Sequence, residues 1–326
     1  MEKKKNDFIA QGSILAIASI LVRVMGMIYR IPMTAIIGDK GNGFYSYAYS
    51  VYTILLLLSS YSLPLAVSKM VSAKAQLGQW RNVKRVFICA IAFAIGIGTT
   101  FGLIVLIGAQ FFTRVFFHSE LAAIALRFMA PTILIMALLG VFRGFFQGLQ
   151  NTLPTAVSQI VEGLINAIMS VVFAYFLFDF GHGMDVAGGT TDLGYAWGAA
   201  GGAIGTGAGA LAGLIFCFIL FVAYRKILAV NISRDKTGTQ QEYGDIFRLM
   251  LSIALPVILS TALYNLIELV DGSLFNNIMA SKGMEDVKDS MWGAYNAKAL
   301  LLVHIPVSIS SAMAVSLVPT LTAAYA

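Results

Sequence analysis

The chain has 326 residues, of which 58% are hydrophobic and only 12% are charged, and its formal net charge is +6. A soluble domain carries roughly 25% charged residues, so this composition excludes a soluble globular protein and indicates a polytopic membrane protein. The positive charge does not indicate nucleic-acid binding, because no basic face with stacking aromatic residues lies outside the apolar stretches.

Eight apolar stretches follow one another along the chain. A spanning helix needs about 20 mainly apolar residues, and we predict spans at 8–37, 44–68, 86–109, 121–148, 155–180, 196–224, 249–279 and 291–321. Residues 1–7 are polar and basic, and the apolar run that follows them is too long for a signal peptide. We therefore predict an all-α integral membrane protein.

The basic residues between the spans predict the orientation of the chain. If the N-terminus is inside, the outer connections hold four basic residues, Lys40, Arg114, Lys282 and Lys288. The inner segments then hold thirteen: Lys3, Lys4, Lys5, Lys69, Lys74, Arg81, Lys84, Arg85, Arg225, Lys226, Arg234, Lys236 and Arg248. This bias predicts a cytoplasmic N-terminus.

A weak internal repeat divides the chain into two lobes. Gly43-Phe-Tyr45 is followed by Ala-Val-Ser at 66–68, and Gly293-Ala-Tyr295 is followed by Ala-Val-Ser at 314–316. We expect a first lobe of six helices at 1–230, a cytoplasmic linker at 231–248 and a partial second lobe of two helices at 249–326. Because repeated lobes in transporters match each other, we expect a truncated chain or a split reading frame that lacks roughly 150 or more residues.

Arginines inside the first lobe are candidates for a substrate site, because a charge at the bilayer centre costs at least about 2.5 kcal/mol. Arg23 and Arg30 lie seven residues apart on the first span, nearly two turns, so they point to one side. One interpretation is a cavity lining that holds phosphate through bidentate hydrogen bonds. The alternatives are an ion pair for Arg23 and snorkelling toward the interface for Arg30.

Arg143, near the inner end of the fourth span, is the third candidate for substrate binding. Glu162 lies at a similar depth on the fifth span, across a tight turn at 151–154. An ion pair between Arg143 and Glu162 that holds this helical hairpin together is the alternative interpretation.

An acidic line on the seventh span is a candidate for cation coupling. Asn265, Glu268 and Asp271 follow one another every three residues, which places their oxygens along one side of the helix. Carboxylates in hydrocarbon suggest a cation or proton site, with Na⁺ or H⁺ as the coupling ion. Pairing with an arginine of the other lobe is the alternative.

The remaining patterns favour structural roles. Gly201, Gly205 and Gly209 belong to a stripe of glycines on the sixth span, which is typical of close helix packing. Cys89 and Cys217 lie inside spans, where two small core residues are more common than a disulfide. The three histidines show no metal spacing and no catalytic constellation is readable, so we expect no metal centre, no other cofactor and no enzymatic activity.

Three runs in the first 150 residues resemble the polysaccharide biosynthesis proteins of the stage V sporulation protein B type. These runs are Arg23-Val-Met-Gly26, Leu63-Pro64-Leu-Ala66-Val-Ser68-Lys69 and Arg143-Gly-Phe-Phe-Gln147-Gly. That family belongs to the multidrug/oligosaccharidyl-lipid/polysaccharide (MOP) exporter superfamily, which includes the lipid II flippases. The resemblance implies a MOP/MATE-like transporter fold, with two six-helix lobes around a central cavity and alternating access.

The resemblance also implies a function. It implies export of an undecaprenyl-pyrophosphate-linked saccharide, lipid II or a polysaccharide repeat unit, across the bacterial plasma membrane for peptidoglycan, spore cortex or surface polysaccharide. It implies as partners a lipid-linked anionic saccharide, membrane lipids and cell-wall synthases. Arg23 matches the family's first-helix arginine motif, Asp271 matches an acidic position of the seventh helix, and Lys298 lies near an arginine of the eighth. The alternatives are a cation-coupled multidrug antiporter of the same superfamily and a non-transporting membrane scaffold.

Overall fold

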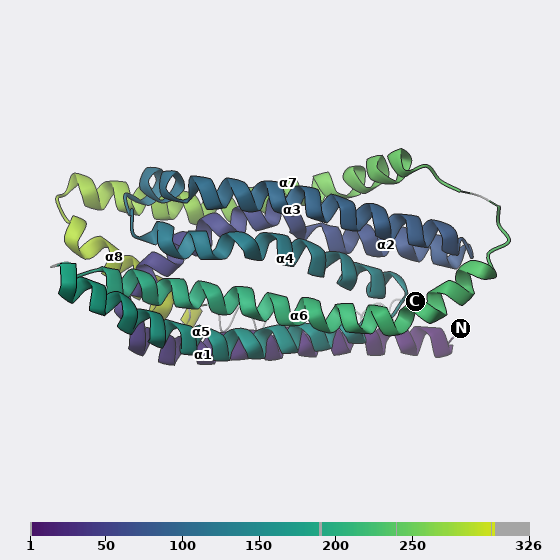
Figure 1. Ribbon diagram of the computed structural model, residues 1–326, viewed down its shortest axis with the longest axis horizontal. Coiled ribbons are helices and arrows are strands. Elements are labelled where there is room, and N and C mark those ends of the chain that lie inside the picture. Colours follow the sequence, from purple (N-terminus) through teal and green to yellow (C-terminus); the bar gives the residue numbers. More distant parts are fainter. Residues whose placement is uncertain (1, 189–190, 239, 301, 304–326) are drawn as a thin grey trace.

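The computed structural model describes residues 2–188, 191–238, 240–300 and 302–303, and every regular element in these ranges is a helix. Figure 1 shows long helices that lie side by side along one axis. The elements are α1 (Glu2–Leu56), the π-helix η1 (Leu57–Tyr61), α2 (Leu63–Gln76), α3 (Trp80–Phe117), α4 (Ala122–Gly148), α5 (Leu153–Gly188), α6 (Leu193–Ser233), α7 (Tyr243–Ser281), α8 (Glu285–Ala294) and the π-helix η2 (Tyr295–Ala299).

The first two predicted spans are joined by a single-residue break. An unbroken α1 of 55 residues would be about 80 Å long, far more than the roughly 30 Å of a hydrocarbon core. Gly38 interrupts it with φ 63° and ψ −176°, a conformation that glycine adopts without a steric penalty. Asn42 Nδ2 donates to the carbonyl oxygen of Gly38 at 2.8 Å and to Thr34 Oγ1 at 3.2 Å, which holds the reversal. In Figure 1 the purple ribbon accordingly runs along one edge and returns through the middle.

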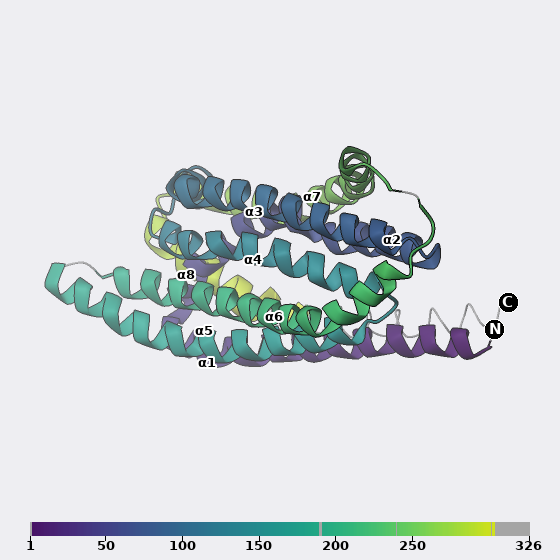
Figure 2. The same ribbon diagram turned by 45° about the vertical axis from the view of Figure 1, so that its right-hand side comes forward.

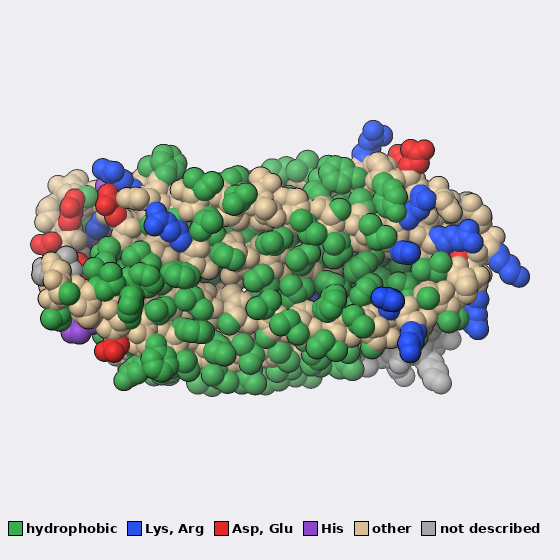
Figure 3. Space-filling model, viewed as in Figure 1, with side chains coloured by type: hydrophobic (Ala, Val, Ile, Leu, Met, Phe, Trp, Pro, Cys, Tyr) green, Lys and Arg blue, Asp and Glu red, His purple; other side chains and the backbone are tan. Residues whose placement is uncertain are grey.

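The later spans follow the hydropathy of the sequence. Within the described residues six helical stretches are long and apolar enough to cross a membrane, and the first of them, Ile17–Gln76, contains the break at Gly38. Figure 3 shows the face of the molecule seen in Figure 1. A continuous apolar band covers its middle, and the charged side chains gather at its two ends. The prediction of an all-α multi-pass membrane protein is therefore confirmed. Of the eighth predicted span, α8 and η2 form the beginning, while residues 304–326 lie outside the described part, as does the second Ala-Val-Ser.

The connections gather at two ends of the molecule. Figures 1 and 2 place the start of α1 at the same end as the connections 77–79, 149–152 and 234–242, and the other connections at the opposite end. At the N-terminal end Arg85 Nη1 donates to the carbonyl oxygen of Gln241 at 2.6 Å, and the backbone N–H of Gln241 donates to Asn82 Oδ1 at 3.0 Å. α6 and α7 extend into the expected linker 231–248 from both sides, and the described residues between them, 234–238 and 240–242, are not helical.

The glycine stripe packs α6 directly against the backbone of α5. A Cβ atom on Gly201 would overlap the backbone of Phe173 and Ala174, and one on Gly205 would overlap Ser170. The predicted role in helix packing is confirmed. Cys89 on α3 and Cys217 on α6 are both buried and free, which agrees with the expectation that they form no disulfide.

Candidate functional site

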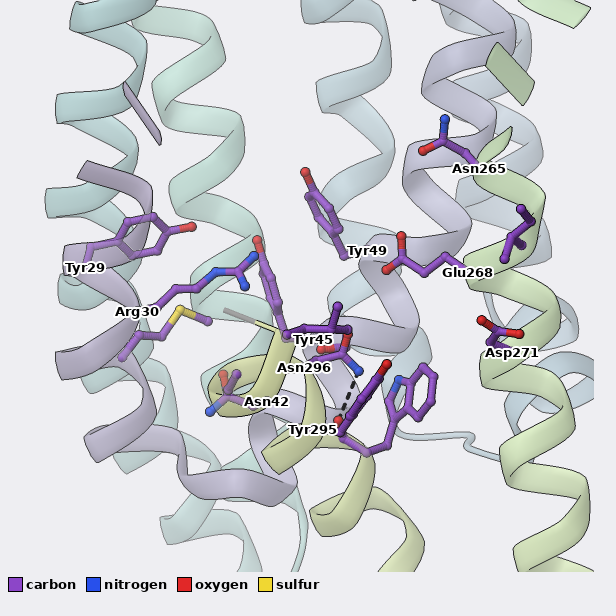
Figure 4. A pocket seen from close by; sticks show the side chains of 16 residues that line it. Tyr29, Arg30, Asn42, Tyr45, Tyr49, Asn265, Glu268, Asp271, Tyr295 and Asn296 are labelled. Atoms are coloured by element: carbon purple, nitrogen blue, oxygen red, sulfur yellow. Dashed lines mark hydrogen bonds between the residues drawn. The ribbon is translucent and has the colours of Figure 1, made fainter. Parts of the chain in front are cut away.

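A cavity of about 430 Å³ lies where the two arms of α1 face α7 and the start of the eighth span. It therefore lies between the predicted first lobe and the described part of the second one. Figure 4 shows its polar side chains converging from these elements. The lining residues are Tyr29, Arg30, Met33, Asn42, Tyr45, Ser46, Tyr49, Asn265, Ile267, Glu268, Asp271, Trp292, Tyr295, Asn296, Ala297 and Leu300.

Arg30 supplies the positive charge of the cavity. It lies on the first arm of α1, between the tyrosine rings of Tyr29 and Tyr45 in Figure 4, and it is half-buried. None of the ion pairs between described residues involves Arg30. Its five N–H donors therefore remain available to a ligand, which is the geometry that recognises phosphate oxygens.

The opposite wall is acidic and comes from α7. Asn265, Glu268 and Asp271 all line the cavity, so the structure places the predicted coupling residues together on one face. Glu268 Oε1 accepts a hydrogen bond of 3.3 Å from the hydroxyl of Ser50 on the second arm of α1. Asn265 Nδ2 donates to the carbonyl oxygen of Thr261 at 2.8 Å, which leaves its amide oxygen free to accept. This wall can bind a cation or a proton.

Arg143 and Arg23 lie elsewhere. The guanidinium of Arg143 is buried between α4 and α5, where Nε donates to Ser158 Oγ at 2.8 Å and Nη2 to Glu162 Oε2 at 2.7 Å. The ion pair between Arg143 and Glu162, which was the alternative interpretation of the sequence, is thus present. Arg143 does not line the cavity. Arg23 is exposed on α1 and is also absent from the lining. Of the three predicted arginines, only Arg30 meets the acidic line.

Sequence reasoning missed the aromatic part of the cavity. Tyr45 and Tyr49 are one turn apart on α1 and their rings stack at 5.8 Å between centroids. Trp292 and Tyr295 at the start of the eighth span lie 5.5 Å apart between ring centroids, tilted by 39°. A usable signal was present, because two tyrosines four residues apart in a span place two hydroxyls on one face, and each hydroxyl needs a polar partner.

Two ion pairs also tie the elements near the reversal of α1. The ammonium of Lys298 on η2 lies 2.7 Å from the carboxylate of Asp39, and that of Lys40 lies 2.7 Å from Asp192 at the start of α6. Within the described residues no group of three or more His, Cys, Asp or Glu side chains could hold a metal ion.

This fold is that of a membrane transporter. A solved MOP superfamily transporter from Pyrococcus furiosus matches 98% of the chain with a TM-score of 0.63 at 16% identity, and the chain covers 65% of that protein. An outward-facing multidrug resistance MATE family transporter of the same superfamily matches 98% of the chain with a TM-score of 0.61, also at 16% identity, over 66% of its own length. At such low identity these structures establish the fold alone.

The family follows from the sequence match. The model of the polysaccharide biosynthesis protein family matches residues 8–324, and the chain belongs to that family. The lipid II flippase MurJ of Bacillus subtilis (strain 168) is 26% identical over 96% of the chain, and stage V sporulation protein B of the same organism is 25% identical over 98%. The chain spans 57% and 58% of the lengths of these two relatives. The resemblance inferred from the arginine, proline and glycine motifs is therefore confirmed.

Proposed function

We propose that the chain is part of an exporter that moves an undecaprenyl-pyrophosphate-linked saccharide, lipid II or a polysaccharide repeat unit, across the bacterial plasma membrane by alternating access. The observation that carries this proposal is Arg30, a guanidinium without an ion-pair partner among the described residues, in a polar and aromatic cavity of a membrane protein. An unpaired charge at this depth is costly unless a ligand or water compensates it. A pyrophosphate is a suitable ligand, because its oxygens match the bidentate donors of arginine.

The remainder of the lining fits the sugar part of such a ligand. Asn42 and Asn296 offer amide groups that both donate and accept hydrogen bonds, as sugar hydroxyl groups do. The rings of Tyr45, Tyr49 and Tyr295 offer flat apolar faces beside them. A cavity of about 430 Å³ suits the pyrophosphate with the adjoining sugar and is too small for a polyprenyl chain, which would stay in the bilayer.

We assign cation coupling to Asn265, Glu268 and Asp271, with Na⁺ or H⁺ as the ion. Their oxygens lie across the cavity from Arg30, so a bound cation and a bound anion would share one space (Figure 4). Movement of substrate rather than chemical conversion is the proposed activity, and cell-wall synthases are the proposed protein partners.

A cation-coupled multidrug antiporter is the second candidate, and the two carboxylates of the cavity favour it. A third candidate is a scaffold without transport activity. Complementation separates the three: cells depleted of their lipid II flippase receive either the 326-residue chain or the longest reading frame that contains it. Growth that depends on Arg30 supports the exporter. Failure to grow, together with resistance to cationic drugs that depends on Glu268, supports the antiporter. Failure of both contradicts transport.

We propose that the N-terminus is cytoplasmic, because the basic connections share its end of the molecule. In a chain whose Cys89 and Cys217 are replaced by alanine, Thr191→Cys should react with an impermeant thiol reagent added to intact cells. Lys236→Cys, which is exposed on the linker, should react only after permeabilisation. The reverse labelling pattern would overturn the orientation.

A further inference from the structure

The start of the eighth span packs unusually closely against the first lobe. A Cβ atom on Gly43, just after the reversal of α1, would overlap the backbone carbonyl of Asp289, and one on Gly293 would overlap that of Asp39. Gly43 and Gly293 are the two glycines that begin the repeated Gly-x-Tyr segments. The two lobes therefore meet backbone to backbone at the end of the molecule opposite to the N-terminus, and we call this the glycine contact.

Lys288 is buried in the same place, and two of its three N–H donors bond backbone oxygens. Its side chain is 4% exposed, and Nζ donates to the carbonyl oxygens of His118 at 2.8 Å and Phe117 at 3.1 Å. These carbonyls end α3, where the helix dipole favours a cation. Lys288 thus fastens α8 to the first lobe through backbone oxygens.

Asp289 is buried beside it with incomplete hydrogen bonding. Its side chain is 9% exposed, and Oδ1 is buried without a hydrogen-bond partner among the described residues. The hydroxyl of Tyr47 faces Asp289, yet it donates its hydrogen to Asn276 Oδ1 at 3.0 Å. The amide of Asn276 is fixed in this orientation because its Nδ2 donates to the carbonyl oxygen of Gly272 at 2.8 Å.

Two acceptors therefore compete for one hydrogen. An ionised carboxylate only accepts hydrogen bonds, as does Asn276 Oδ1, and Tyr47 has a single hydrogen to give. A protonated Asp289 resolves the conflict, because it can donate to Tyr47 Oη while Tyr47 donates to Asn276. Burial favours the same outcome, since an apolar environment disfavours the charged form of a carboxyl group.

We propose that Asp289 is a proton-binding site of the glycine contact, protonated while the contact is closed and ionised when the contact opens to water. The opening rests on the alternating access proposed above, whereas the protonation of the closed state does not. This site is separate from the acidic wall of the cavity, which Asp289 does not line.

The other charges that face Asp289 do not replace the proton. Lys40 of α1 and Asp192 at the start of α6 act on it from the first lobe, but they pair with each other at 2.7 Å, so their effects on Asp289 largely cancel. The ammonium of Lys288 favours the ionised form of Asp289, but burial acts more strongly in the opposite direction, and Lys288 donates its hydrogen bonds to the carbonyls that end α3. Asp39, whose backbone meets Gly293, is paired with Lys298 at 2.7 Å.

Trp292 provides a direct test. Its ring stacks on Tyr47 at 6.3 Å and 12°, so its fluorescence reports the contact once Trp80 and Trp197 are replaced by phenylalanine. We expect a single fluorescence transition at a pH above the ordinary pKa range of a carboxyl group, because burial disfavours the charged form. Asp289→Asn should abolish it, because the amide mimics the protonated group, and Asp289→Glu should shift it. Asp271→Asn serves as the control and should keep it.

A transition that persists unchanged in the Asn variant, or that is absent from the parent, would overturn the proposal. If the Asn variant does not fold, the shift in the Glu variant decides the question. The fluorescence test uses no saccharide, so it is independent of the complementation assay. If complementation fails but the titration is observed, the proposed export function is contradicted and the proton-binding site is not.

Discussion

Arg143 and Arg30 are the same residue type in the same membrane protein, and the structure treats them in opposite ways. Arg143 is buried between α4 and α5 and is bonded to both Ser158 and Glu162. Arg30 is half-buried, faces a cavity and takes part in none of the ion pairs between described residues. Depth in the membrane therefore does not separate the two arginines. They differ in that Arg143 has an ion-pair partner and Arg30 has none among the described residues.

The packing around the two arginines also differs: it is close around Arg143 and leaves a cavity beside Arg30. Near Arg143, Gly209 lies so close to α5 that a Cβ atom would stand 2.6 Å from the carbonyl oxygen of Glu162. Near Arg30, tyrosine and asparagine side chains enclose empty space. The first region is closely packed, and the second surrounds the cavity in which we propose that a ligand binds.

The largest expected effect is on stability and belongs to Arg143. Arg143→Ala leaves the half-buried carboxylate of Glu162 without its partner, which costs about 3 kcal/mol, the lower end of the range for a buried pair. Arg30→Ala should leave the free energy of unfolding nearly unchanged. Denaturant unfolding in detergent micelles measures both. Arg143→Met combined with Glu162→Leu is the control and should recover most of the loss; equal losses in the two single variants would break the comparison.

The second effect is on ligand binding and belongs to Arg30. Its loss removes charge-assisted hydrogen bonds worth about 1.5–3 kcal/mol, so Arg30→Ala should weaken binding of a pyrophosphate-linked saccharide roughly 10- to 100-fold. Arg30→Lys should keep part of the affinity, because a lysine lacks the planar fork. Binding to the purified full-length protein is the measurement.

The same titration applied to Arg23→Ala and Arg127→Ala sharpens the comparison. Arg127 is an exposed arginine of α4 and should not respond. A loss in the Arg23 variant as large as in the Arg30 variant would extend the site along α1 beyond the cavity, as the spacing of the two arginines predicts.

The third effect concerns the acidic wall. Asp271→Asn keeps the shape of the side chain and removes its charge, so transport should respond less to a sodium or proton gradient while folding is retained. A coupling energy of about 1–2 kcal/mol corresponds to a roughly 5- to 30-fold change in the coupled affinity. Transport is measured with each gradient separately, beside Glu268→Gln. A variant that responds to both gradients like its parent would exclude Asp271 as the coupling residue.

The smallest effect lies in the linker, far from both arginines. The backbone N–H of Arg81 and the hydroxyl and N–H of Thr237 donate to Asp235 and lower its pKa from 3.8 to about 2. A depressed carboxyl pKa stabilises the folded linker above pH 3.8, and this contribution is lost as the pH falls toward about 2.

Amide hydrogen exchange at 234–242 measures this effect. Exchange should accelerate as the pH falls through that window, relative to the intrinsic rate, and Asp235→Asn should remove the pH dependence. Glu242→Gln is the matched control in the same linker. An unchanged dependence in the Asn variant would assign the effect to another group.

The helices were predictable because hydropathy acts locally, and the spans from 86–109 to 249–279 lie within α3–α7 except for residue 121. Gly38 was not identified as the point of reversal, because its φ of 63° and its hydrogen bond with Asn42 appear only in the structure. Asn265, Glu268 and Asp271 line the same cavity, as predicted, because residues three apart lie on one face of a helix. The separation of Arg30 from Arg143 could not be read from the chain, because it depends on which partner each side chain finds.

The aromatic residues and the contact at α8 were missed for a different reason. Tyr45, Tyr49 and Trp292 look like ordinary core residues in apolar spans, and only the cavity distinguishes them. The packing of Gly43 on Asp289 joins residues about 250 positions apart, a relation that the weak repeat suggested only as similarity and not as contact.

The glycines of α6 have a mechanical consequence. With Gly201 and Gly205 seated on the backbone of α5, these helices cannot slide past one another without a collision of main-chain atoms. α5 and α6, which are 36 and 41 residues long, therefore form a rigid pair of helices. A displacement at one end of this helix pair moves the other end as well, because the two helices move as a rigid body. Any bending of the molecule would then occur outside these two helices rather than within them.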